Sequence, residues 1–220
     1  MRGIALSVGM SLLLLAAATS QEMRTFTHPT LGFAISAPAS WKPDTSDPEV
    51  AVGFETPEDS SFYLAVTSTP LPMTFASEST YRDAANGYSS EFRAGVAEEL
   101  GIDASKVVEL ARRVHEVRGM QVATLDFRAP APDDWVFRAR ARLIIADGNL
   151  YAVVISADED EFTENEPLVN QILDSFEPKD RTSGQFPVRL IGIALGVACL
   201  MGVLMLGGIV LLVRKLTGRL

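Results

Sequence analysis

The strongest constraint on this chain is an uninterrupted apolar run from Leu190 to Val213, followed by a short tail that carries three cations. A helix rises about 1.5 Å per residue, so this run would be about 36 Å long, enough to cross a hydrocarbon core of about 30 Å with some tilt. We therefore expect one transmembrane helix over residues 188–213 and a tail over residues 214–220.

The opposite end of the chain has the layout of a secretory signal peptide. One arginine precedes an apolar stretch at residues 4–18, which is short for a stable membrane span and normal for a signal core. Small residues suit cleavage after Ala18 or Ser20, so we expect a signal peptide over residues 1–20. The alternative is an uncleaved N-terminal anchor, which leaves the middle of the chain on the same side of the membrane.

These two ends predict the topology. With the N-terminal side exported, the tail over 214–220 is expected in the cytoplasm, and its cations agree with the positive-inside rule. We expect a single-pass protein of a bacterial inner membrane with its N-terminal domain in the periplasm. Residues 22–178 have the length of one ordinary domain, and residues 179–187 form a polar linker of limited reach.

The charge of residues 22–178 argues against one class of partner. This segment holds 27 Asp and Glu against 12 Lys and Arg. Its surface would repel a phosphate backbone, so nucleic acid is not an expected partner. The sole cysteine, Cys199, lies in the apolar run, so the domain has no disulfide and depends on its core for stability.

Period-two alternation predicts a domain rich in strands. The expected strands lie around Phe26 and at residues 33–37, 50–54, 61–68, 107–117, 120–128, 136–146 and 150–157. A tight turn over residues 147–149 joins the last two, because glycine at Gly148 permits the positive φ that a hairpin turn needs.

Two segments have helical periodicity instead. From Ser77, apolar residues recur at three- and four-residue steps until Gly101, which is placed as a C-cap glycine. A second amphipathic helix is expected over residues 168–176, after an acidic stretch. Trp41, which follows an early strand, is expected to pack against the long helix near Tyr88 or Phe92.

Four strings together resemble the PsbP-like superfamily: FTHPTLGFAISAPASWKP, GMQVATLDF, ADGN and NQILDSFEP. The likeness covers residues 24–178, and its motifs describe a fold rather than a reaction. It implies an α+β domain with an antiparallel sheet flanked by helices, to which this chain adds the C-terminal transmembrane helix. It also implies a non-enzymatic binding or assembly role. No metal site is carried over, because no matching site motif is present.

An arginine row is the first candidate site. Arg138, Arg140 and Arg142 alternate with apolar residues, so their guanidinium groups should project from one sheet face while the apolar residues enter the core. If that face is exposed, the row could hold an acidic partner or anionic headgroups, because arginine forks suit carboxylates and phosphates. The alternative is cross-strand pairing with acids of the domain such as Asp126.

The acidic stretch at residues 158–166 is the second candidate. Asp158, Asp160 and Glu164 offer oxygen ligands of the kind that calcium prefers, but the stretch lacks the glycine and the spacing of an EF-hand loop. The alternative is that these acids lie before and within the first turn of a helix, where they interact favourably with its dipole.

The apolar run contains the third candidate. Gly192 and Gly196 are spaced as GxxxG, with Cys199 close to the same face, and such stripes of small residues let helices approach closely. The run could therefore self-associate or contact a larger membrane complex.

Catalytic motifs are weak by comparison. The two histidines, His28 and His115, accompany neither a GxSxG motif nor a cysteine nucleophile. We expect no enzyme activity and no cofactor. The sequence favours a membrane-anchored periplasmic accessory or interaction module, with the membrane and a protein in or at the membrane as partners. A membrane-tethered envelope enzyme and a small-anion or metal-binding domain are the alternatives.

Overall fold

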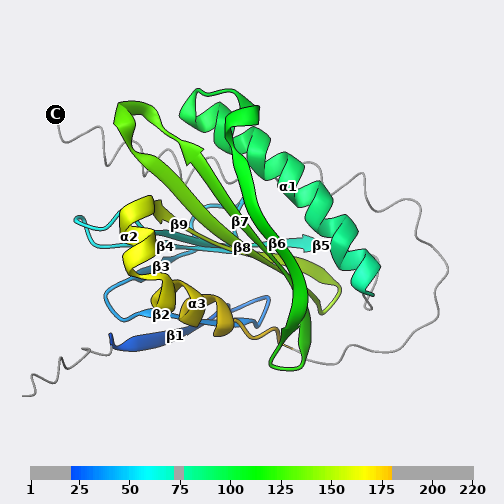
Figure 1. Ribbon diagram of the computed structural model, residues 1–220. Coiled ribbons are helices and arrows are strands. Elements are labelled where there is room, and N and C mark those ends of the chain that lie inside the picture. Colours follow the sequence, from blue (N-terminus) through cyan, green and yellow to red (C-terminus); the bar gives the residue numbers. More distant parts are fainter. Residues whose placement is uncertain (1–20, 72–76, 180–220) are drawn as a thin grey trace, which may run out of the picture.

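The computed structural model describes residues 21–71 and 77–179, which form two antiparallel sheets and a few helices (Figure 1). The strands are β1 Met23–Thr27, β2 Ala34–Pro38, β3 Lys42–Asp44, β4 Val52–Glu55, β5 Tyr63–Pro70, β6 Val108–Val117, β7 Met120–Pro130, β8 Val136–Ala146 and β9 Asn149–Asp158. The helices are α1 Glu78–Leu100, α2 Glu159–Glu164 and α3 Glu166–Asp174, with 3-10 turns η1 Ala104–Lys106 and η2 Pro132–Asp134.

Strands β1 and β2 form a separate hairpin, and the other seven form one sheet in the order β3-β4-β5-β9-β8-β7-β6. Every strand pair is antiparallel. Strands β3, β4 and β5 form one side of the large sheet, and helix α1 follows them in the chain. Strands β6 to β9 then form the other side, and β9 pairs with β5 (Figure 1). The α+β antiparallel architecture expected from the sequence is confirmed.

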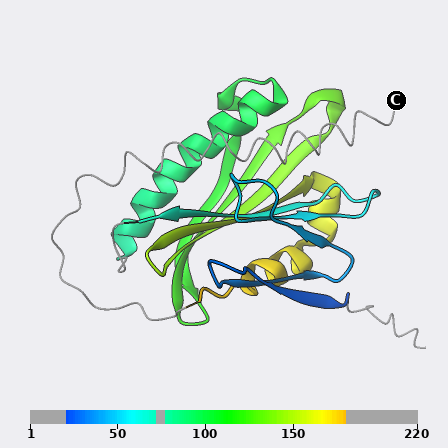
Figure 2. The same cartoon turned by 180° about the vertical axis from the view of Figure 1, so that it is seen from behind.

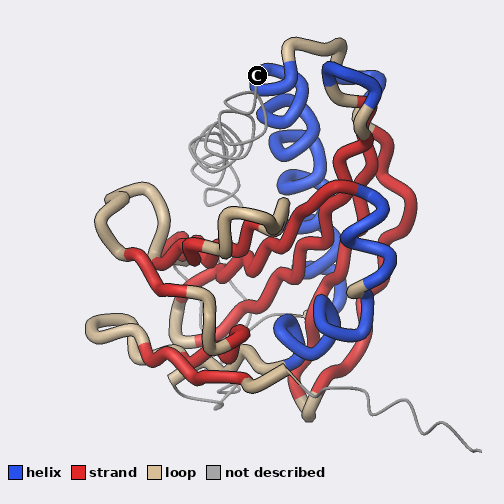
Figure 3. The backbone as a smooth tube through the Cα atoms, turned by 90° about the vertical axis from the view of Figure 1, so that its left-hand side faces the viewer, coloured by secondary structure: helices blue, strands red, loops and turns tan. Residues whose placement is uncertain are grey.

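Two hydrophobic cores lie on opposite faces of the large sheet. On one face α1 buries Phe92 against Phe127 and Phe137, together with small side chains of β7 and β8. On the other face α2, α3 and the β1–β2 hairpin enclose a core that includes Phe33 and Tyr151. Figures 2 and 3 show these layers from behind and from the side. Each sheet face therefore has its own helical cover.

Local chemistry explains where α1 starts and stops. The Ser77 hydroxyl accepts a hydrogen bond from the Thr80 backbone N–H, and the Thr80 side chain accepts one from the Ser77 N–H, which completes a capping box. At the other end Gly101 has a φ of 63°, the left-handed conformation that ends many helices. The expected start and end of this helix are confirmed.

The turn between β8 and β9 also follows the expectation. Asp147 has a φ of 53° and Gly148 a φ of 70°, so both central residues adopt the positive φ of a type I′ hairpin turn. The Asn149 side-chain amide donates to the Asp147 carbonyl and closes the turn.

The structure corrects the expected position of Trp41. This side chain is buried, but it packs on Phe62 at a centroid separation of 5.7 Å in the core opposite α1. The prediction that it contacts Tyr88 or Phe92 is wrong. The physical reason is that β3, which follows Trp41, pairs with β4 at the edge of the sheet farthest from β6, whereas α1 covers β6, β7 and β8.

Of the helices in residues 21–71 and 77–179, none is long and apolar enough to cross a membrane. The signal peptide expected over residues 1–20 lies outside the described residues. The transmembrane helix expected over residues 188–213, with Gly192, Gly196 and Cys199, lies outside them as well.

Candidate functional site

The arginine row lies on one face of β8, as the alternation predicts. The intervening residues Phe137, Ala139, Ala141 and Leu143 are fully buried on the α1 face. The arginines project to the opposite face, but that face is covered there by α2 and α3. The relative exposure of the side chain is 20% for Arg138, 8% for Arg140 and 7% for Arg142. The expectation of an exposed row is therefore wrong.

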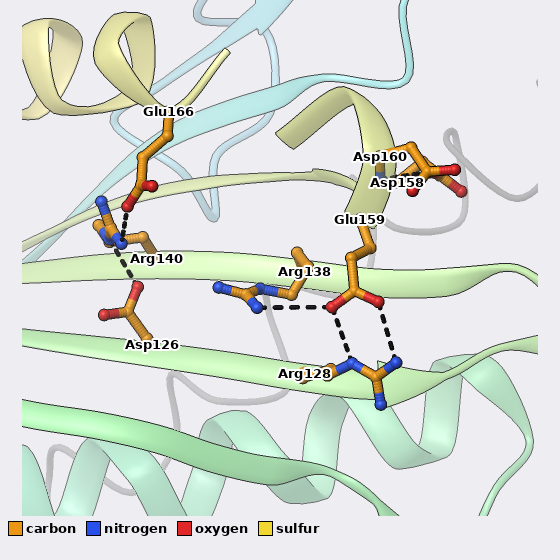
Figure 4. A network of polar contacts seen from close by, with 8 residues as sticks. All are labelled: Asp126, Arg128, Arg138, Arg140, Asp158, Glu159, Asp160 and Glu166. Carbon is orange, nitrogen blue, oxygen red and sulfur yellow. Dashed lines mark hydrogen bonds and ion pairs between the residues drawn. The ribbon is translucent and has the colours of Figure 1, made fainter. Parts of the chain in front are cut away.

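Arg140 is the centre of the row (Figure 4). Its Nε donates to Asp126 Oδ1 of β7 at 2.5 Å, Nη1 donates to Asn170 Oδ1 at 2.6 Å, and Nη2 donates to Glu166 Oε1 at 2.8 Å. Its guanidinium also lies over the Phe162 ring, 5.8 Å from the centroid. Burial opposes the charge, but hydrogen bonds with the two carboxylates outweigh it and raise the pKa of Arg140.

Glu159, the first residue of α2, joins two arginines from neighbouring strands (Figure 4). It accepts two hydrogen bonds from Arg128, from Nε at 2.8 Å and from Nη2 at 2.9 Å, and a longer one from Arg138 Nη1 at 3.5 Å. The hydrogen bonds from Arg128 are the main cause of the lowered pKa of Glu159. The bidentate geometry fixes the start of α2 over the sheet.

The last arginine of the row pairs with the end of α3. Arg142 Nη1 donates to Asp174 Oδ1 at 2.5 Å. Glu166, Asn170 and Asp174 occupy every fourth position of α3, so they form one polar stripe facing β8. The other face of the same helix buries Val169, Ile172 and Leu173 in the core. Helix α3 is thus held to the sheet by both apolar and ionic contacts.

The three arginines of the row therefore stabilise the fold. Arg138, Arg140 and Arg142 each have a carboxylate partner within the domain, and three of these acids come from the covering helices. The pairing with Asp126 that the sequence offers as the alternative is observed. An external anion would have to displace these carboxylates from a largely buried layer.

The acids proposed as metal ligands are not brought together. Asp158 is the N-cap of α2, where its carboxylate accepts a hydrogen bond from the Asp160 backbone N–H at 2.9 Å. Asp160 and Glu164 are exposed at the start and end of the short helix. Across residues 21–71 and 77–179, no three His, Cys, Asp or Glu side chains are placed to hold a metal ion. The structure therefore favours the capping and dipole interpretation of this stretch.

The two histidines lie apart in the chain, one in a turn between strands and the other on a strand. His28 accepts hydrogen bonds at Nδ1 from the backbone N–H groups of Thr30 and Leu31, and its ring stacks on Phe33 at 5.1 Å. It therefore organises the turn between β1 and β2. His115 is exposed on β6, opposite Val122 of β7.

The sequence does not single out the partners of the row, namely Glu159, Glu166, Asn170 and Asp174. One signal was available: on the second amphipathic helix, polar residues recur at every fourth position opposite the apolar stripe. Such a stripe is ordinary on an exposed helix surface, and only the packing of α3 across β8 shows that it faces a row of arginines.

These features define a class of protein, an α+β domain in which an antiparallel sheet is covered by a long helix on one face and by two short acidic helices on the other. The family model described as PsbP matches residues 21–178. The chain therefore belongs to the PsbP family.

A solved structure shows the same fold. The solution structure of cyanobacterial PsbP (CyanoP) from Synechocystis sp. PCC 6803 is similar with a TM-score of 0.56 and 18% sequence identity, over 80% of this chain and 98% of that one. The Saccharomyces cerevisiae Ran-binding protein Mog1p gives a TM-score of 0.47 and 11% identity, over 73% and 97% of the two chains. No curated protein matches by sequence. The similarity to CyanoP shows the fold alone, in agreement with the resemblance seen in the sequence.

Proposed function

We propose that the protein is a membrane-anchored accessory module of a bacterial inner membrane, which holds its PsbP domain in the periplasm and binds a protein of a membrane complex. The observation that carries the proposal is the family match over residues 21–178, because a PsbP domain is commonly a non-enzymatic accessory module. The anchor and the export signal rest on the apolar segments at residues 190–213 and 4–18.

The arginine row offers neither a catalytic group nor a binding surface to a partner. A catalytic arginine must reach a substrate, whereas Arg140 and Arg142 are buried and paired with carboxylates of their own domain. Their arrangement stabilises the layer that α2 and α3 form on the sheet. The partner surface is therefore sought elsewhere on the domain.

The point where the domain ends indicates which side is near the bilayer. Glu177 pairs its backbone with Ala34, and Arg118 of the β6–β7 turn forms an ion pair with Glu177. Only residues 179–187 separate this point from the proposed span, a reach of about 30 Å when fully extended. The β6–β7 turn and the end of the β1–β2 hairpin would thus lie on the membrane-proximal side.

Two experiments test the proposal. An alkaline phosphatase fusion after Leu220 should be inactive, and one inserted at Arg181 should be active; the reverse pattern would overturn the topology. Affinity purification of the tagged full chain from detergent-solubilised native membranes should recover a defined membrane protein in a stable ratio. A chain recovered alone, with turnover of an envelope substrate, would favour the membrane-tethered enzyme instead.

A further inference from the structure

Strand β6 is an open border of the large sheet. Its one sheet neighbour among the described residues is β7, and it is ten residues long. The opposite border, β3, has only three residues, and one of them is Pro43, so that edge is short and lacks a donor. The two large hydrophobic side chains that are exposed in the described part of the chain, Val108 and Leu110, both lie on β6. The long edge is the one left open.

A bulge limits the regular part of this edge. The register with β7 shifts between Glu109 and Ala111, and from Ala111 to Val117 the pairing is regular. Helix α1 contacts Val107, the residue before β6, whose carbonyl accepts a hydrogen bond from Arg93 Nε, and it also contacts Arg112, whose Nη1 donates to Asn86. The segment open to a new strand is therefore residues 111–117, and its middle residue is Val114.

This segment is complementary to itself. In an antiparallel pair of two copies centred on Val114, each residue faces one on the same side of the sheet, so Arg112 faces the partner's Glu116. Ala111 faces the partner's Val117, and Arg113 faces the partner's His115. Glu116 is exposed. Arg112 lies on the same sheet face and already donates to Glu109 and Asn86 of its own chain, so the partner's Glu116 would join an existing ion pair. The charges therefore match twice across the two-fold axis.

We propose that two copies of the chain join through β6, antiparallel and centred on Val114, to form one continuous sheet. The two-fold axis stands normal to the sheet, so both α3 helices lie on one face and both chains leave the domains on that side. The inference uses only the described domain, so it stands or falls separately from the proposed accessory function.

Cysteine cross-linking of the full chain tests the register. The natural cysteine is first replaced (Cys199→Ser), and Val114→Cys is added. Mild oxidation in native membranes should convert most of the protein to a disulfide-linked dimer, because the two 114 positions face each other. The matched control is Glu116→Cys, for which the two cysteines would lie about 13 Å apart along the strands, too far for a disulfide. Equal cross-linking at both positions, or none at 114, would overturn the proposal.

Charge reversal is an independent test of the proposed strand register. In the Val114→Cys background, Glu116→Lys should slow cross-linking at least tenfold, because it sets a lysine against the partner's Arg112. Asp83→Lys makes the same charge change on the exposed side of α1 and should leave the rate unchanged. If both variants cross-link at the parent rate, the Arg112–Glu116 register is wrong.

A second pair of positions guards against misfolding of Val114→Cys. Arg113→Cys and His115→Cys alter exposed side chains. Copies carrying one change each should form a mixed disulfide only when both are present. An edge occupied by a different protein would leave all these variants monomeric and would overturn the proposal.

Discussion

Replacing Arg140 with methionine tests whether the arginine row holds α3 to the sheet. Its side chain is 8% exposed and that of Asp126 is 6% exposed. Without Arg140, the nearest cation to Asp126 is Arg113, 3.9 Å away and itself 67% exposed. Leaving one charge of a buried pair uncompensated costs about 3 to 5 kcal/mol. With a urea m-value of about 2 kcal/mol/M, the midpoint of unfolding should fall by about 1.5 to 2.5 M.

The measurement is urea unfolding of residues 21–179, followed by tryptophan fluorescence. Arg140→Met combined with Asp126→Leu should recover most of the loss, because two apolar residues replace a buried ion pair at little net cost. The matched control is Arg82→Met, which breaks the exposed pair with Glu78 and should cost about 0.5 kcal/mol or less. The reasoning is refuted if Arg140→Met costs no more than Arg82→Met, or if the double variant is as unstable as the sum of its parts.

Three further expectations follow from other parts of the structure. Trp41→Ala should cost about 3 to 5 kcal/mol in the same unfolding assay because it empties a buried site beside Phe62, and an unchanged midpoint would place the side chain at the surface. Gly148→Ala should cost about 1 kcal/mol through its positive φ, whereas Gly87→Ala in α1 should be neutral or stabilising. The lowered pKa of Glu159 means that the unfolded chain binds its proton first, so stability should fall as the pH drops below about 4.3. Glu159→Gln should make that fall shallower, and an identical pH profile would show that the pair with Arg128 has no effect on stability.

The parts of the fold that follow from sequence are those in which local pattern and burial agree. Along β8, strict alternation places Phe137, Ala139 and Ala141 on one face and the arginines on the other, and the structure has this arrangement. Gly101 and Gly148 adopt the positive φ that the expected cap and turn require. In each case the deciding interaction lies within a few residues or across one hairpin.

The parts that do not follow depend on which layer covers which face. Alternation shows that Arg138, Arg140 and Arg142 share a face, but their exposure depends on α2 and α3, which follow β9 in the chain and lie over β8. The prediction for Trp41 is wrong for the same reason. The sequence shows that an apolar residue at a strand end is buried, but it does not show which of the two cores the residue joins. The role of the acids at residues 158–166 cannot be read from the sequence either, because helix capping and metal binding both use carboxylate side chains.

The pairing of the arginine row within the domain limits which surfaces can contact a partner. Arg140 is not available to a partner, because it donates three hydrogen bonds, to Asp126, Glu166 and Asn170. The α1 face is likewise occupied by a core that includes Phe92 and Phe127. An open sheet border differs from both, because its outward backbone groups can pair without disturbing either core. The ion pairs of the row hold α2 and α3 against β8, two strands away from the β6 edge.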